Sequence, residues 1–100
     1  IKAYSTILPY QPRNWVLFNN LAWHLCLSGE DLQQAEQLSR ATIMAEPSNS
    51  VFLDTYAWIM YQLGDYTSAF FYIQRALENA TPETREEVTA HYKAILKKLQ

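Results

Sequence analysis

The chain has 100 residues, 49% of them hydrophobic, and a formal net charge of −2 with eight basic residues. This composition predicts one globular domain or part of one, and it excludes a disordered tail and a basic surface for nucleic acid. No apolar run reaches the roughly 18 residues that span a membrane, so we expect no membrane insertion.

Residues 1–8 are predicted to form the last two turns of a helix whose partner helix is missing. They match a stretch 35 positions later, in which Ser39, Thr42, Ile43 and Pro47 correspond to Tyr4, Ile7, Leu8 and Pro12. We therefore expect residues 1–12 to end a preceding repeat and the chain to be a piece of a longer array. The uncovered apolar end predicts either a weak homodimer through this end or a monomer in which Lys2 and Tyr4 shield it.

The stretch 14–48 predicts a hairpin of two helices, A and B. Helix A is expected over 15–28, because Asn14 can cap its free N–H groups and Gly29 permits the left-handed turn that ends it. Helix B is expected over 32–45. A capping box of Asp31 and Gln34 begins helix B, and Pro47 stops it.

A second hairpin is predicted over 49–81, because the pattern repeats. Ala22-Trp23 falls on Ala57-Trp58 and Gly29 on Gly64 at an offset of 35, which drops to 34 beyond the glycine. A period of about 34 residues is the signature of stacked helical hairpins. The second helix A is expected to end at Leu63 and the second helix B to cover 66–79, with three candidate caps: Asn49 or Ser50 for the former and Asp65 for the latter.

The last helix is predicted from Pro82 to about Leu99. Thr81 is its expected N-cap, and proline is favoured at the first helical position. Its acidic residues lie early and its lysines late, which suits the helix dipole. We interpret 82–100 as a capping helix, since Lys93 stands where another packed repeat would need a small residue.

The A helices are apolar nearly all round, whereas the B helices are polar on one side. In the first helix A only Asn19, Asn20 and His24 interrupt the apolar run. Helices of this kind are covered on several sides, so we expect an inner layer of A helices and an outer layer of B helices. Ala35 and Ala69 are expected where helices A and B cross closely.

This pattern resembles the tetratricopeptide repeat, and "LDTYAW" is similar to forms common in its bacterial members. The resemblance spans roughly 1–99 and implies an all-α, right-handed solenoid of helical hairpins with two full repeats, a preceding half-repeat helix and a C-terminal cap. The matching residues of the first unit are Phe18, Leu21-Ala22, Leu25, Gly29, Leu32, Ala35, Ser39, Thr42 and Pro47. Those of the second unit are Leu53, Tyr56-Ala57, Met60, Gly64-Asp65-Tyr66, Ala69, Ile73, Ala76 and Pro82.

The resemblance implies a module that binds a peptide or protein segment in a concave groove lined by the A helices. The expected groove residues are Asn19, Trp23, Asp54, Trp58, Tyr61 and Gln62, with Cys26 and Leu27 on the same side. Trp58 is a stronger binding candidate than Trp23, which equally fits a role as filler between neighbouring helices. The alternative is a structural segment that stacks on its parent array, or on a copy of itself, without a groove ligand.

Some members of the family hold a peptide carboxylate with a clamp of basic residues and asparagine. The matching positions here are Asn19, Trp23, Thr55, Glu87 and His91, of which only the histidine can become cationic. We therefore expect no such clamp, and an apolar or mixed peptide as the ligand.

The residue pattern predicts neither an enzyme nor a cofactor or metal site. His24 and Cys26 are two positions apart on a helix and point in different directions, so they cannot form a dyad. Cys26 is expected to be a small buried hydrophobe. Glu87 and His91 share a helix face, where we expect a solvated pair, since two ligands do not make a zinc site.

Overall fold

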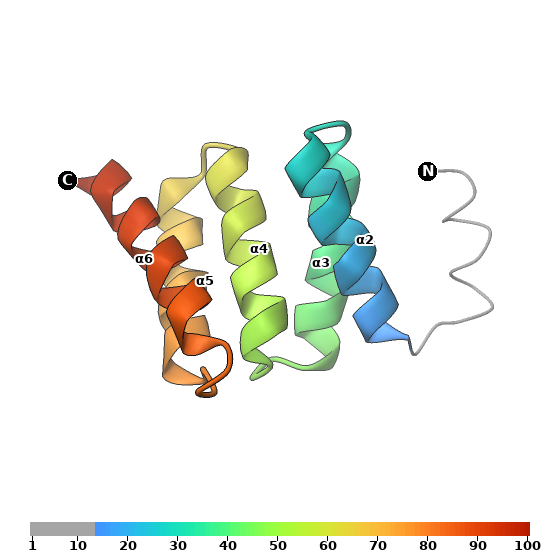
Figure 1. Cartoon of the computed structure of the whole chain (residues 1–100). Coiled ribbons are helices and arrows are strands. Elements are labelled where there is room, and N and C mark those ends of the chain that lie inside the picture. The colour runs from blue at the N-terminus through green and yellow to red at the C-terminus, as the bar shows by residue number, and fades with distance from the viewer. Residues whose placement is uncertain (1–13) are drawn as a thin grey trace.

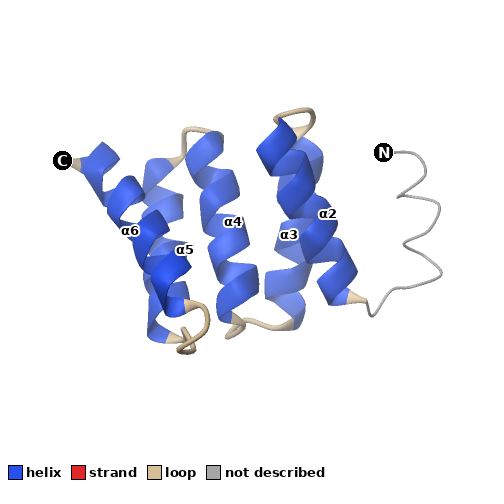
Figure 2. Ribbon diagram, in the orientation of Figure 1, coloured by secondary structure: helices blue, strands red, loops and turns tan. Residues whose placement is uncertain are grey.

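The structure is a computed structural model that describes residues 14–100. Within this range the chain forms helices and no strand, in agreement with the predicted all-α class (Figure 1; Figure 2). The helices are α2 (Trp15–Ser28), α3 (Leu32–Ala45), α4 (Ser50–Gln62), α5 (Tyr66–Glu78) and α6 (Arg85–Leu99). The predicted half-repeat helix at residues 1–12 and the dimer contact through it lie outside the described residues.

Side-chain caps begin the first four helices, as the sequence predicts. The side-chain oxygen of Asn14 accepts from the backbone N–H of Leu17 at 3.0 Å, and Asn49 caps α4 in the same way. Asp31 accepts from the N–H of Gln34 at 3.0 Å, which is the first half of the predicted capping box. Each cap satisfies an N–H group that the first helical turn leaves free.

Two glycines make the turns inside the hairpins. Gly29 has φ 71° and Gly64 has φ 88°, a left-handed conformation that costs glycine little. Asp65 follows Gly64 directly, and its side chain accepts from the backbone N–H of Ser68 at 3.1 Å to start α5. The left-handed turn and the cap that follows it therefore reverse the chain between paired helices.

The start of α6 differs from the prediction. The helix begins at Arg85 and not at Pro82, and the preceding residues form a turn. Thr81 is not the N-cap: Thr84 precedes the helix without a side-chain cap bond, and its hydroxyl accepts from the backbone N–H of Thr81 at 3.0 Å. Two further corrections are small: α4 ends at Gln62 and α5 at Glu78, each one residue earlier than expected.

The helices pack in two layers. α2, α4 and α6 lie side by side in one layer, where α4 contacts both of the others, and α3 and α5 cover the opposite side. This arrangement agrees with the expected inner and outer helices. α4 is the most buried, because it touches all four other helices, whereas α2 leaves Val16 and Leu27 each 62% exposed.

The core lies between the two layers. Ala35 and Ala69 are fully buried, as expected for close helix crossings, together with Ile59, Ile73 and Ile95. On the α3 side the hydroxyl of Tyr56 donates to Oε2 of Glu36 at 2.8 Å. Burial, with this hydrogen bond, raises the pKa of Tyr56 well above its usual range, so the hydroxyl stays a donor.

None of the described helices is long and apolar enough to cross a membrane. This finding agrees with the composition, and it concerns residues 14–100 alone.

Candidate functional site

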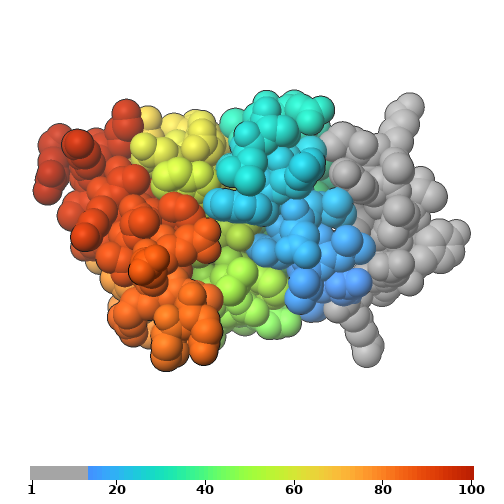
Figure 3. Space-filling view, viewed as in Figure 1, coloured from blue at the N-terminus to red at the C-terminus, as the bar shows by residue number. Residues whose placement is uncertain are grey.

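A cleft of about 180 Å³ opens on the face that α2, α4 and α6 share. α2 contributes Asn19, Asn20 and Trp23, α4 contributes Val51, Asp54 and Thr55, and α6 contributes Glu87. In Figure 3 the atoms of α2, in blue, and of α6, in orange, flank those of α4, in green, on the face toward the viewer. The three helices of one layer therefore build the cleft together.

Beside the cleft a buried polar contact joins α4 to α6. Nδ1 of His91 lies 2.7 Å from Oδ1 of Asp54, and the side chains of His91 and Asp54 are only 15% and 9% exposed. A buried acidic group needs such a partner, because burial without one carries a large desolvation cost. The contact thereby fixes α6 on α4 at the level of the cleft.

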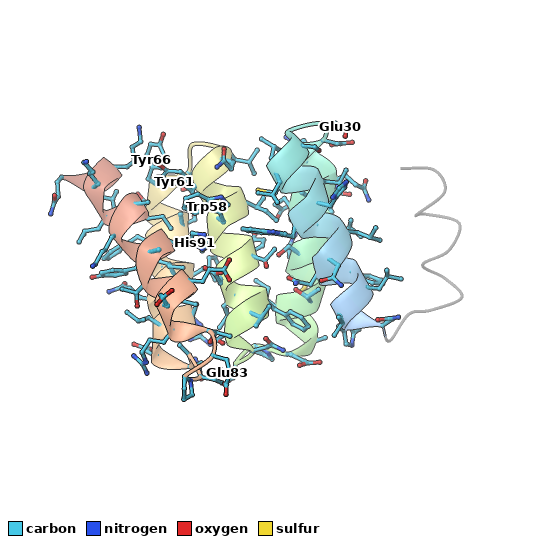
Figure 4. All side chains as sticks on the ribbon, viewed as in Figure 1. Glu30, Trp58, Tyr61, Tyr66, Glu83 and His91 are labelled. Carbon is cyan, nitrogen blue, oxygen red and sulfur yellow. The ribbon has the colours of Figure 1, made fainter. Side chains whose placement is uncertain are left out.

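A row of aromatic rings continues from this contact toward the loop between α4 and α5. The His91 ring stacks on Trp58 with centroids 4.3 Å apart, and Trp58 stacks on Tyr61 at 4.5 Å. Tyr61 meets Tyr66 at 5.6 Å, and these four residues follow one another in Figure 4. Trp23 of α2 joins the other end of the row, 5.9 Å from the His91 ring.

Hydrogen-bond acceptors at the cleft are left without partners. Oδ1 of Asn19 is buried and makes no hydrogen bond within residues 14–100. In the same part of the chain Asp54 uses Oδ1 for His91, while no bond to its Oδ2 is found. Glu87 is exposed and has no ion pair with any described residue. A buried acceptor without a partner costs about 1–3 kcal/mol, so it signals a group that a ligand can satisfy.

The structure divides the expected groove residues into three sets. Asn19, Trp23 and Asp54 come together at the cleft. Trp58 and Tyr61 lie beside it in the aromatic row, where each already packs against other rings. The remaining expected residues line neither the cleft nor the aromatic row. Gln62 and Leu27 are exposed outside the cleft, and Cys26 is buried.

The prediction that Glu87 and His91 form a solvated pair is wrong for His91. His91 is largely buried and bonds Asp54, because the tilt of α6 across α4 brings together residues 37 positions apart. The sequence placed Glu87 and His91 on one helix face, and the resemblance matched both to clamp positions, but neither indicated that His91 would bond Asp54. Asn20 and Val51 also line the cleft, although neither was among the expected groove residues.

Cys26 behaves as the buried hydrophobe that the sequence predicts. It is 5% exposed, and burial raises the pKa of its thiol to about 11. The thiol is therefore protonated at neutral pH and a poor nucleophile. Within the described residues no three His, Cys, Asp or Glu side chains lie close enough to hold a metal ion.

Comparison with known proteins adds no relative. No family model matches the chain, and no curated protein or solved structure is significantly similar to it.

Proposed function

We propose that this chain is a protein-interaction module of the tetratricopeptide-repeat type, which binds a peptide or protein segment on the face formed by α2, α4 and α6. The observation that carries the proposal is the cleft between these helices, where an indole, an aliphatic side chain and unpartnered acceptors meet. Peptide sites combine apolar contact area with a few polar groups of this kind.

Two features support the repeat character. Equivalent caps, Asn14 and Asn49, start the two hairpins 35 positions apart, and glycines with positive φ turn both of them. Stacked hairpins in constant register form a right-handed solenoid, and their first helices line its concave side. The segment "LDTYAW" is similar to forms common in bacterial members of the family, and this resemblance supports the same assignment to the repeat type.

The cleft supports binding better than catalysis. Neither Asp54 nor Glu87 lies beside an activated nucleophile, since Cys26 is buried with a raised thiol pKa. The volume of about 180 Å³ is also smaller than the ~300–1,000 Å³ typical of small-molecule sites. A single side chain of a larger partner fits this space.

The test is a selection of short peptides from a random display library against the whole chain. Selected peptides are then measured on Val51→Lys, which fills the cleft, and on Val16→Lys, which places the same charge at the equivalent position of α2 outside it. We expect Val51→Lys to lose about tenfold or more in affinity, roughly 1.4 kcal/mol, and Val16→Lys to bind as the parent does.

The outcome also separates this function from that of a purely structural segment. Peptides that bind both variants equally, or the selection of no peptide, would remove the groove proposal and favour a segment that only stacks on its neighbours.

A further inference from the structure

The charge at the cleft is one-sided. Among residues 14–100 its two ionisable lining residues, Asp54 and Glu87, are both acidic, and no lysine or arginine of this range lines it. Within the described part of the chain Glu87 has no cationic partner, and Asp54 shares only one of its two oxygens, with His91. An anionic group entering here would meet like charge, whereas a cationic one would meet the exposed carboxylate of Glu87 and the Asp54 oxygen that His91 leaves free.

The acceptors need donors as well as charge. Asn19 is 6% exposed, and its carbonyl oxygen has no partner among the described residues. Asn19, Asp54 and Glu87 thus bring acceptor-bearing side chains from three helices to the lining of one small space. A group that satisfies all three must carry several N–H donors in a fixed arrangement.

The third feature is the indole of Trp23, which lines the same cleft and is half-buried. Cations bind over indole faces, and a planar guanidinium stacks on them while its edges donate hydrogen bonds. An ammonium group is more strongly hydrated and cannot form the paired donor contacts.

We propose that the cleft binds the guanidinium group of an arginine side chain in the partner peptide, held by Asn19, Asp54 and Glu87 beside Trp23. The inference rests on the proposed function and names the chemistry of its partner. It also replaces the apolar or mixed ligand expected from the sequence with a basic one.

The test uses N-acetyl-argininamide as the probe and N-acetyl-citrullinamide as an uncharged control of the same shape. Each is titrated into the whole ¹⁵N-labelled chain while the indole N–H signal of Trp23 is followed by NMR. We expect a saturable shift with the arginine probe. The affinity for the citrulline probe should be lower by a factor of about ten or more, because charge-assisted hydrogen bonds are roughly twice as strong as neutral ones.

A pair of variants locates the contact. Glu87→Gln removes one acidic side chain of the cleft, and Glu86→Gln makes the same change in charge on the neighbouring exposed residue of α6. We expect the former to weaken the arginine probe about threefold to tenfold and the latter to leave it unchanged. Both positions are exposed, so the fold is retained.

The results that would overturn the assignment are equally specific. Equal shifts by the two probes, an equal effect of both glutamate variants, or equal affinity for N-acetyl-lysinamide would each exclude a guanidinium site. If display peptides bind in a Val51-dependent way without arginine, this inference fails and the proposed function stands. If the arginine probe binds but no peptide does, the proposed function fails.

Discussion

At the scale of single residues, Asp54 and His91 form the most consequential contact in the described chain. The two side chains are buried together, 2.7 Å apart, between α4 and α6. Asp54 is therefore less free to select a ligand by charge than an exposed groove residue would be. Replacing it with lysine would bury a new charge and damage the fold before any ligand preference could be read.

We predict that Asp54→Ala and His91→Ala each lower the free energy of unfolding by about 1–3 kcal/mol, because each leaves a buried polar partner unsatisfied. The double variant should lose less than the sum, with a coupling of about 0.5–3 kcal/mol. Urea unfolding followed by circular dichroism measures all three. Glu87→Ala, an exposed change on the same helix, serves as the control, and additive losses within ~0.5 kcal/mol would contradict the contact.

The single cysteine offers a second test at this scale. Burial raises the thiol pKa of Cys26 to about 11, so at pH 8 we expect Ellman's reagent to react far more slowly with the folded chain than with the same chain in denaturant. Because the pKa of Cys26 is higher in the folded chain than its unfolded value of 9.0, its protonation contributes fully to the free energy of unfolding below pH 9.0. This contribution is lost as the pH rises toward 11. Equal rates in both states would show that Cys26 is accessible.

At the scale of elements, small residues decide how closely the two layers approach. Ala69 of α5 has no exposed surface and belongs to the buried core cluster. We predict that Ala69→Leu overpacks this position and costs about 1–3 kcal/mol, measured by thermal or urea unfolding. Thr67→Leu adds a similar side chain to an exposed position of the same helix and should change stability by less than ~0.5 kcal/mol. An unchanged melting temperature for Ala69→Leu would place the helix crossing elsewhere.

The boundaries of the elements depend on local chemistry, and most of them could be predicted for that reason. Asn14, Asp31 and Asp65 cap helices through bonds to residues three positions away, which a sequence pattern displays directly. The start of α6 could not be read in this way, because neither Thr81 nor Thr84 caps the helix with its side chain. The bond from Thr81 to the Thr84 hydroxyl closes a turn and delays the helix by one turn.

At the scale of the whole molecule, α6 is an integral part of the core. Val88 and Ile95 are 1% and 0% exposed, and α6 contacts both α4 and α5. We predict that Ile95→Ala lowers the free energy of unfolding by about 2–5 kcal/mol, with tryptophan fluorescence and circular dichroism reporting one shared transition. Leu99→Ala, at a position 43% exposed, should cost far less. A separate early transition seen only in fluorescence would mean that α6 unfolds by itself.

The sequence by itself determined the helical class, the four helices from α2 to α5 and the assignment of the A helices to one layer. It could do so because caps, glycine turns and apolar periodicity act over a few residues. Only the tertiary structure decided that His91 pairs with Asp54, that Trp58 packs inside an aromatic row, and that Glu87 joins the expected groove residues Asn19 and Asp54 at one cleft. These contacts join three helices, and they depend on the angle at which α6 crosses α4, which the packing of many side chains sets together.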